Sequence, residues 1–158
     1  MSEKSISEKA IKRNITWIEA VENAITENSN EIIAKKIMKA AGKKCAQQIL
    51  EECKQILGKM PENVDELIEA TNIRRQRQLN LNSLWERDGN KAHLKIDECG
   101  CTLVKAGLAK PNPVHCLCTV GMFESVFSAV CQGSVNVEII KTIGFGDNVC
   151  EFYVYFQE

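Results

Sequence analysis

The sequence predicts an α+β domain in which N-terminal helices pack on a C-terminal antiparallel sheet. Apolar residues recur at helical spacing in residues 1–90 and alternate with polar residues in much of 91–158. The chain has 158 residues, 44% of them hydrophobic and 26% charged, which is the size and composition of an ordinary globular domain. We therefore expect the helical half and the cysteine-rich half, 91–158, to form one folding unit.

The N-terminal region predicts one amphipathic helix. Isoleucines recur at helical spacing between Ser7 and about Thr26, with charged residues mostly on the other faces: Ile11, Ile15, Ile18 and Ile25. The polar run Asn28-Ser29-Asn30 then interrupts the pattern and supplies a cap for the next helix.

Two more helices are expected in the first half. The second segment begins with Ile33 and Ile37 and runs towards Gly42. An apolar stripe follows: Ala46, Ile49, Leu50, Cys53, Ile56 and Leu57. Gly58 ends this stripe, as glycine commonly does at a helix C-terminus. The third helix turns three apolar residues inward: Val64, Leu67 and Ile68. Arginines near its end are expected to form a solvated face: Arg74, Arg75 and Arg77.

The period changes after the turn Asp88-Gly89-Asn90. Leu94 and Ile96 alternate with polar neighbours and predict a strand, and Thr102-Leu103-Val104 predicts a second one. Apolar residues at helical spacing predict a short helix over residues 119–131, with Thr119 as its cap. Residues 135–139 and 150–156 alternate again, which predicts an antiparallel hairpin with one buried face.

Charge and hydropathy exclude several classes of partner. The net charge is −1, so we expect no general attraction to nucleic acid. No segment approaches the roughly 18 apolar residues that a membrane span needs. The polar start, Met1 to Ser5, does not have the pattern of a secretory signal, and we expect a cytoplasmic protein with no membrane partner.

Cysteine is the informative residue type, with six of eight lying between Cys99 and Cys150. The main pattern is Cys99-x-Cys101, fourteen intervening residues, and Cys116-x-Cys118. Residues two apart in an extended segment point to the same side, so each pair presents two sulfur atoms to one point. Four thiolates suit zinc, and also an iron–sulfur cluster. Reduced thiols in another role and a redox or disulfide pair remain open alternatives.

The remaining cysteines and the histidines have simpler interpretations. Cys150 begins a buried face and is either a core residue or a further ligand. Cys53 and Cys131 are expected to be structural, and Cys45, after two lysines, to be a partly buried thiol. His115 adjoins Cys116, and neighbours in a strand point to opposite faces, so we expect a surface histidine rather than a Cys–His dyad. Metal ligation by His115 is the alternative.

One run of residues near the C-terminus carries a family resemblance. It consists of Cys116-Leu-Cys118-Thr-Val-Gly121-Met-Phe-Glu124-Ser-Val-Phe127, then Val135-Asn-Val137-Glu138, Gly146-Asp147 and Cys150-Glu-Phe152. The region from about Cys99 to Phe156, which contains this run, resembles the C-terminal half of a cysteine-rich prokaryotic family. That family is related to the 4-vinyl reductase domain and to L-2-amino-thiazoline-4-carboxylic acid hydrolase-like proteins.

The resemblance implies a fold like that of 4-vinyl reductase and transport-particle subunits, with a small apolar ligand pocket and a homodimer. Some members bind zinc, and the matching ligand positions here are Cys118, Glu138 and Cys150. A further cysteine of that set is replaced, since Lys141 or Thr142 stands near its place. Cys99, Cys101 and Cys116 are the residues that could replace it.

These observations favour a small cytoplasmic domain that binds zinc through thiolates and holds a small apolar or thiol-related ligand. Two alternatives remain. One is a metal-assisted hydrolase of a cyclic thio-amino-acid-like substrate, in which the metal activates water. The other is a dimerising scaffold subunit whose cysteines only pack. The sequence identifies no catalytic residue.

Overall fold

The structure, a computed structural model, describes residues 8–157, so the expectation about a secretory signal rests on residues outside this range. The helices are α1 (Glu8–Asn28), α2 (Glu31–Leu57), α3 (Val64–Leu79), α4 (Thr102–Lys105), α5 (Pro113–Cys116) and α6 (Cys118–Ser128). The strands are β1 (Glu86–Asp88), β2 (Lys91–Ile96), β3 (Val135–Lys141) and β4 (Cys150–Phe156). The predicted α+β fold class is confirmed.

The long helices begin and end where the sequence indicates. The side chain of Asn30 caps α2 by accepting a hydrogen bond from the Ile33 amide at 2.9 Å. Gly58 ends α2 with a positive φ of 75°, a conformation that glycine adopts without a side-chain clash. In the first turns of α2 the buried residues are Ala34 and Met38, whereas Ile33 and Ile37 are exposed.

The four strands form one antiparallel sheet in the order β1-β2-β4-β3. The inner face of β4 packs in the core and consists of Cys150, Phe152, Val154 and Phe156. The outer face carries polar and aromatic side chains, among them His93 and Tyr153, whose rings stack. Strands β3 and β4 are antiparallel neighbours, so the predicted hairpin with one buried face is confirmed. Strand β2 pairs with the other side of β4.

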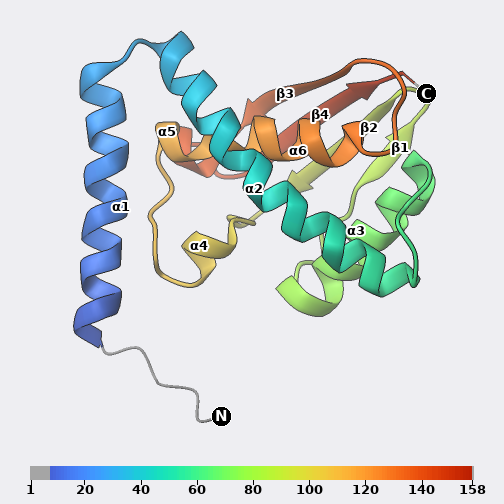
Figure 1. Cartoon of the computed structure of the whole chain (residues 1–158), viewed down its shortest axis with the longest axis horizontal. Coiled ribbons are helices and arrows are strands. Elements are labelled where there is room, and N and C mark those ends of the chain that lie inside the picture. Colours follow the sequence, from blue (N-terminus) through green and yellow to red (C-terminus); the bar gives the residue numbers. More distant parts are fainter. Residues whose placement is uncertain (1–7, 158) are drawn as a thin grey trace.

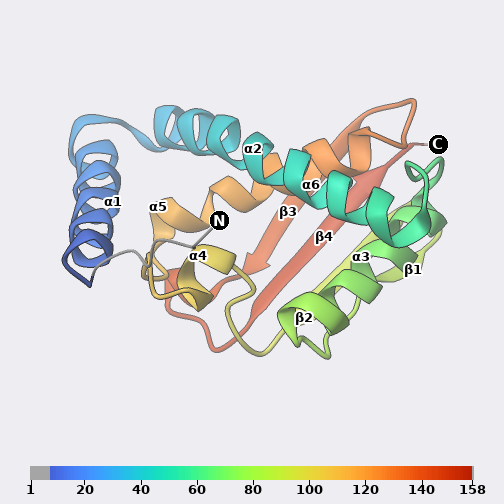
Figure 2. The same cartoon turned by 60° about the horizontal axis from the view of Figure 1, so that its bottom comes forward.

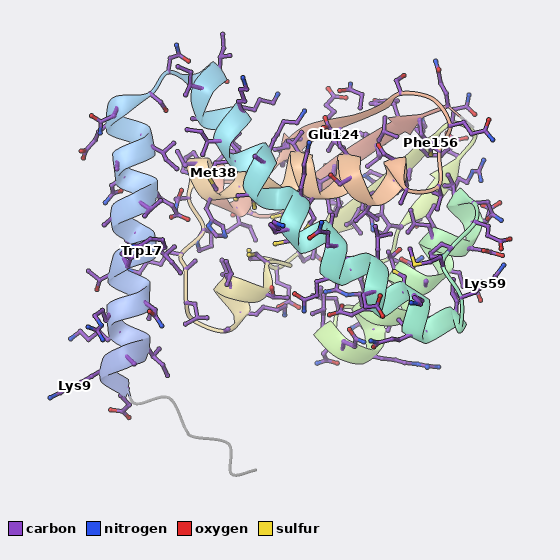
Figure 3. The ribbon with its side chains drawn as sticks, viewed as in Figure 1. Lys9, Trp17, Met38, Lys59, Glu124 and Phe156 are labelled. Atoms are coloured by element: carbon purple, nitrogen blue, oxygen red, sulfur yellow. The ribbon has the colours of Figure 1, made fainter. Side chains whose placement is uncertain are left out.

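Helices cover the inner face of the sheet, with α6 against the strands and α2 crossing over α6 (Figures 1 and 2). Lys39 of α2 and Glu124 of α6 form an ion pair of 2.7 Å at this crossing, where Figure 3 labels Glu124 and, on α2, Met38. Helix α1 stands to one side, next to α5, and Trp17 lies there, far from Phe156 at the other end of the molecule (Figure 3).

Two glycines allow the close crossing of α2 and α6. A Cβ atom at Gly42 would lie 1.9 Å from the carbonyl oxygen of Cys118, and one at Gly121 would lie 2.0 Å from that of Lys39. Both contacts are far inside normal van der Waals distance. The backbones of the two helices therefore come into direct contact at this crossing.

Three sequence expectations about the helices and strands are wrong. Thr102–Val104 belong to the helical turn α4 and not to a strand, because the chain leaves the sheet after Ile96. Thr119 does not cap α6; the cap is Leu117, without a side-chain hydrogen bond. The arginines of α3 are not simply a solvated face, because Arg75 is buried and its Nε donates to the carbonyl oxygen of Ser83 at 2.8 Å.

In the part of the chain that the structure describes, no helix combines the length and the apolar character that crossing a bilayer would take.

Candidate functional site

Within residues 8–157, a cavity of about 260 Å³ lies beneath α2, at one end of the sheet. It lies where strand β2 ends and β4 begins, next to the paired residues Ile96 and Cys150. The segment from Cys99 to Thr119 leaves the sheet here and wraps around the cavity through α4 and α5. We call this space the cysteine-lined cavity.

Three kinds of side chain line the cavity. The apolar wall consists of Ile49, Leu79, Ile96, Leu103, Met122, Phe123 and Phe152. The thiol wall consists of Cys45, Cys99, Cys101, Cys116, Cys118 and Cys150, and Figure 3 shows yellow sulfur atoms gathered between α2 and α4. The polar part of the lining includes Gln48, Gln78 and the ion-paired side chains of Arg74 and Glu52. The combination of an apolar wall with a few polar groups is typical of small-molecule sites.

A second hollow, of about 660 Å³, is larger but more open to solvent. It lies along β3 and is bordered by charged side chains, including Glu31, Lys35, Lys141 and Asp147. An open, charged groove offers little enclosed apolar surface to a ligand, so the cysteine-lined cavity is the better candidate site.

A hydrogen-bonded relay reaches the cavity wall from α1. His115 Nε2 lies 3.3 Å from Cys101 Sγ, and its Nδ1 is hydrogen-bonded to a carboxylate oxygen of Glu22. Asn112 donates its side-chain N–H to the other carboxylate oxygen of Glu22. His115 and Glu22 are only 5% and 6% exposed, so water does not replace these bonds. The side-chain order is thiol, imidazole, carboxylate.

The relay favours the ionised forms of Cys101 and His115. Burial is the largest single effect on the Cys101 thiol and would raise its pKa. The hydrogen bond and charge of His115 and the backbone amides of Val104 and Leu103 together outweigh burial, so the pKa is lowered. The hydrogen bond to Cys101 is the main cause that raises the pKa of His115, to about 9, and the bond to Glu22 adds to it against the effect of burial. At neutral pH the His115 imidazolium therefore donates one N–H hydrogen bond to the Cys101 sulfur and one to the Glu22 carboxylate.

The other thiols of the wall behave differently from Cys101. Burial is the main cause that raises the pKa of each of them, to about 12 for Cys118. At Cys45 the charge of Cys101 adds to the effect of burial, and the charge of Arg74 offsets only part of it. Protonated thiols are weak nucleophiles. Among the thiols of this wall, Cys101 therefore has the surroundings that most favour the thiolate.

The structure brings together most of the predicted metal ligands but does not arrange them as a metal site. Cys99, Cys101, Cys116, Cys118 and Cys150 all face the cysteine-lined cavity. Even so, nowhere in residues 8–157 do three His, Cys, Asp or Glu side chains stand as they would around a metal ion. The spacing argument assumed extended segments, whereas Cys116 ends α5 and Cys118 begins α6. Zinc, an iron–sulfur cluster and a metal-assisted hydrolase stay predictions.

Glu138, taken as a ligand from the family resemblance, lies elsewhere. It is exposed on β3 and accepts a hydrogen bond of 3.1 Å from the Tyr155 hydroxyl. Its neighbour Val137 points into the core, so Glu138 projects from the opposite face of the sheet. The sheet therefore separates Glu138 from the five cysteines.

Sequence reasoning missed the relay. His115 was expected on the surface, but it is buried and its partner is Cys101 rather than the adjacent Cys116. One available signal was the pair Asn112-Pro113, since asparagine is a good helix cap and proline is favoured at the first helical position. That pair predicts the helical turn α5, which turns His115 inward. No local signal marks Glu22, which is 93 residues away in the chain.

Comparison with known proteins gives the family and the fold. A family model described as "Family of unknown function (DUF6144)" matches residues 2–158. A search of curated proteins finds no match.

Several solved structures are similar. A trafficking protein particle complex subunit 3 from Naegleria fowleri, covalently bound to palmitic acid, has a TM-score of 0.64 at 14% identity, over 94% of this chain and 95% of that one. The phenol-responsive sensory domain of the transcription activator PoxR, with phenol, has a TM-score of 0.56 at 11% identity, over 90% and 74%. At these identities the likeness concerns the fold, and it confirms the predicted transport-particle-subunit-like architecture.

A vinyl-4-reductase family protein from Methanocaldococcus jannaschii is also similar, with a TM-score of 0.43 at 15% identity, over 99% of this chain and 85% of that one.

Proposed function

The chain belongs to DUF6144, a family of unknown function, and we propose that it binds a small, largely apolar ligand in the cysteine-lined cavity. The observation that carries the proposal is the cavity of about 260 Å³, whose lining combines apolar side chains with thiols. Burial of apolar ligand surface in such a space is the main source of affinity.

The size of the cavity limits the ligand. Cavities of about 150 Å³ lined by aliphatic and aromatic side chains bind benzene, and drug-sized ligands need about 300 Å³ or more. At about 260 Å³, the cavity suits a single substituted ring or a short acyl chain. The polar lining near Arg74 and Glu52 suits a ligand with one polar end.

Proteins of the same fold provide independent support. The trafficking-complex subunit is bound to palmitic acid and the PoxR domain to phenol, so this fold holds an acyl chain in one protein and a single ring in another. The proposed ligand classes for this chain are the same two. Octanoate and phenol are therefore suitable probes.

Calorimetric titration of the purified protein with octanoate and with phenol tests the proposal. Met122 lines the cavity, and replacing it with tryptophan (Met122→Trp) fills part of the space. We expect this variant to bind the better probe at least about 10-fold more weakly, a loss of about 1.4 kcal/mol. Met60 is exposed and outside the lining, so Met60→Trp is the matched control. Equal affinity of both variants, or no binding of either probe, contradicts the proposal.

A further inference from the structure

We propose that Cys101 is a nucleophile that accepts an acyl group from an acyl thioester, with His115 as the proton-transfer residue and Glu22 as the positioning residue. The proposal deepens the proposed function and rests on it, because the acyl chain would occupy the same cavity. The geometry that points to it is the hydrogen-bonded series of Cys101, His115 and Glu22 in the cavity wall.

The geometry distinguishes Cys101 from the other thiols of the wall. Its sulfur lies 3.3 Å from a ring nitrogen of His115, within reach for proton transfer. Cys150 and Cys116 are oriented instead by the segment around Thr142: the Ile143 amide donates to Cys150 Sγ at 3.5 Å, and a Cβ atom at Gly144 would lie 2.3 Å from Cys116 Sγ. Cys101 thus has the arrangement of an activated nucleophile.

The second nitrogen of His115 fixes the orientation of the ring. Glu22 accepts a hydrogen bond from Nδ1, so Nε2 can only point at Cys101. Asn112 holds Glu22 from the other side and also accepts the His115 backbone N–H at 2.8 Å. A buried base oriented by a third group is the general form of a nucleophilic triad.

The chemistry of the cavity favours an acyl thioester as the reaction partner. The apolar wall, including Met122, Phe123 and Phe152, accommodates the chain of the acyl group. A thiolate attacks a thioester carbonyl readily, since thiolates are strong nucleophiles towards such carbon. His115 Nε2, which lies 3.3 Å from the Cys101 sulfur, is placed to give the departing thiolate the proton that it requires.

The step balances in atoms and charge. The Cys101 thiolate attacks the carbonyl carbon of the donor and a new sulfur–carbon bond forms. The bond between that carbon and the donor sulfur then breaks, and the donor leaves as a thiol after taking the proton from His115 Nε2. The products are S-acyl-Cys101, neutral His115 and the free donor thiol, and no electron transfer to an external partner is needed.

The experiment mixes the full chain with the octanoyl thioester of N-acetylcysteamine, quenches with acid, and measures the mass of the intact protein and the released donor thiol. We expect one octanoyl group per chain, mapped to Cys101 by peptide analysis, or release of thiol if the acyl group turns over. Cys101→Ser should abolish both signals. Cys131, outside the cavity lining, provides the matched thiol control, and Cys131→Ser should react like the wild type.

Two further variants test the roles of the relay. His115→Gln should slow acylation about 100-fold or more, the usual contribution of a proton-transfer residue. Glu22→Gln should also slow it while leaving the affinity for octanoate unchanged, a separation that a merely structural role would not produce. An adduct on another cysteine, no reaction above the buffer rate, or an undiminished rate in Cys101→Ser overturns the proposal.

Octanoate titration of Cys101→Ser separates this proposal from the proposed function. If octanoate binds and no acyl transfer to Cys101 occurs, the nucleophile proposal fails and the binding proposal stands. If Cys101 is acylated but octanoate does not bind and Met122→Trp reacts normally, the cavity proposal fails instead.

Discussion

Replacing Glu22 with glutamine should destabilise the protein in a pH-dependent way and loosen α1. The pKa of His115 rises from 6.5 to about 9 on folding, which corresponds to roughly 3 kcal/mol of stability. Cys101 is the largest cause of this rise and Glu22 a smaller one, so Glu22→Gln should remove about 1–2 kcal/mol. For a chain of this size the melting temperature should fall by about 3–6 °C.

The sign of the pH effect follows from the direction of the shift. A group whose pKa is raised by folding stabilises the native state fully below its unfolded pKa, here 6.5, and loses that effect as the pH rises through about 9. Urea unfolding of the wild type and Glu22→Gln should therefore differ most near pH 6 and least near pH 10. Amide exchange should be faster in α1 of the variant, because Glu22 is the buried link between α1 and α5.

Glu19 provides the matched control on the same helix. It forms a 3.3 Å ion pair with Lys110, whose side chain is 81% exposed. Exposed pairs of this kind contribute about 0–1 kcal/mol, so Glu19→Gln should have little effect. Equal unfolding free energies for the two variants at both pH values would refute the assignment of the buried relay.

Three other predictions concern the fold, the metal and the assembly. Gly42→Ala should lower the free energy of unfolding in urea by about 1–3 kcal/mol, because the new Cβ meets Cys118. Lys43→Ala, on the exposed side of α2, should leave it unchanged, and equal stability of the two variants would contradict the close crossing. Elemental analysis tests the zinc prediction, which expects one zinc per chain with protected thiols; protein purified without added metal that holds no zinc and has all its thiols titratable would contradict it. Light scattering tests the predicted homodimer, and Ile33→Asp on the exposed apolar part of α2 should weaken it; a monomeric wild type would exclude it.

The sequence predicts the long elements well because their signals are local. The break at Asn28–Asn30, the stop at Gly58 and the alternation in residues 150–156 each lie within a few residues of the feature they predict. The short turns α4 and α5 were missed because four residues are too few to show a period. The signal that begins α5, Asn112-Pro113, is a matter of capping rather than hydropathy.

The candidate site was predicted only in part. The clustering of cysteines predicts one shared place for Cys99, Cys101, Cys116 and Cys118, and all four line the cysteine-lined cavity, because the segments that carry them flank the same end of the sheet. Which thiol is reactive depends on contacts across the fold: Glu22 reaches His115 from 93 residues away, and Glu138 falls on the wrong face of β3. Such relations depend on packing and register, which the period of a sequence does not contain.

The most direct test of the cavity as a ligand site is a crystal structure of the protein grown with saturating octanoate. We expect electron density for the chain against Met122 and Phe123, with its carboxyl end within reach of the Cys101 sulfur or the polar group at Arg74. Density in the open groove along β3, or none in the cavity under saturating conditions, would contradict the account.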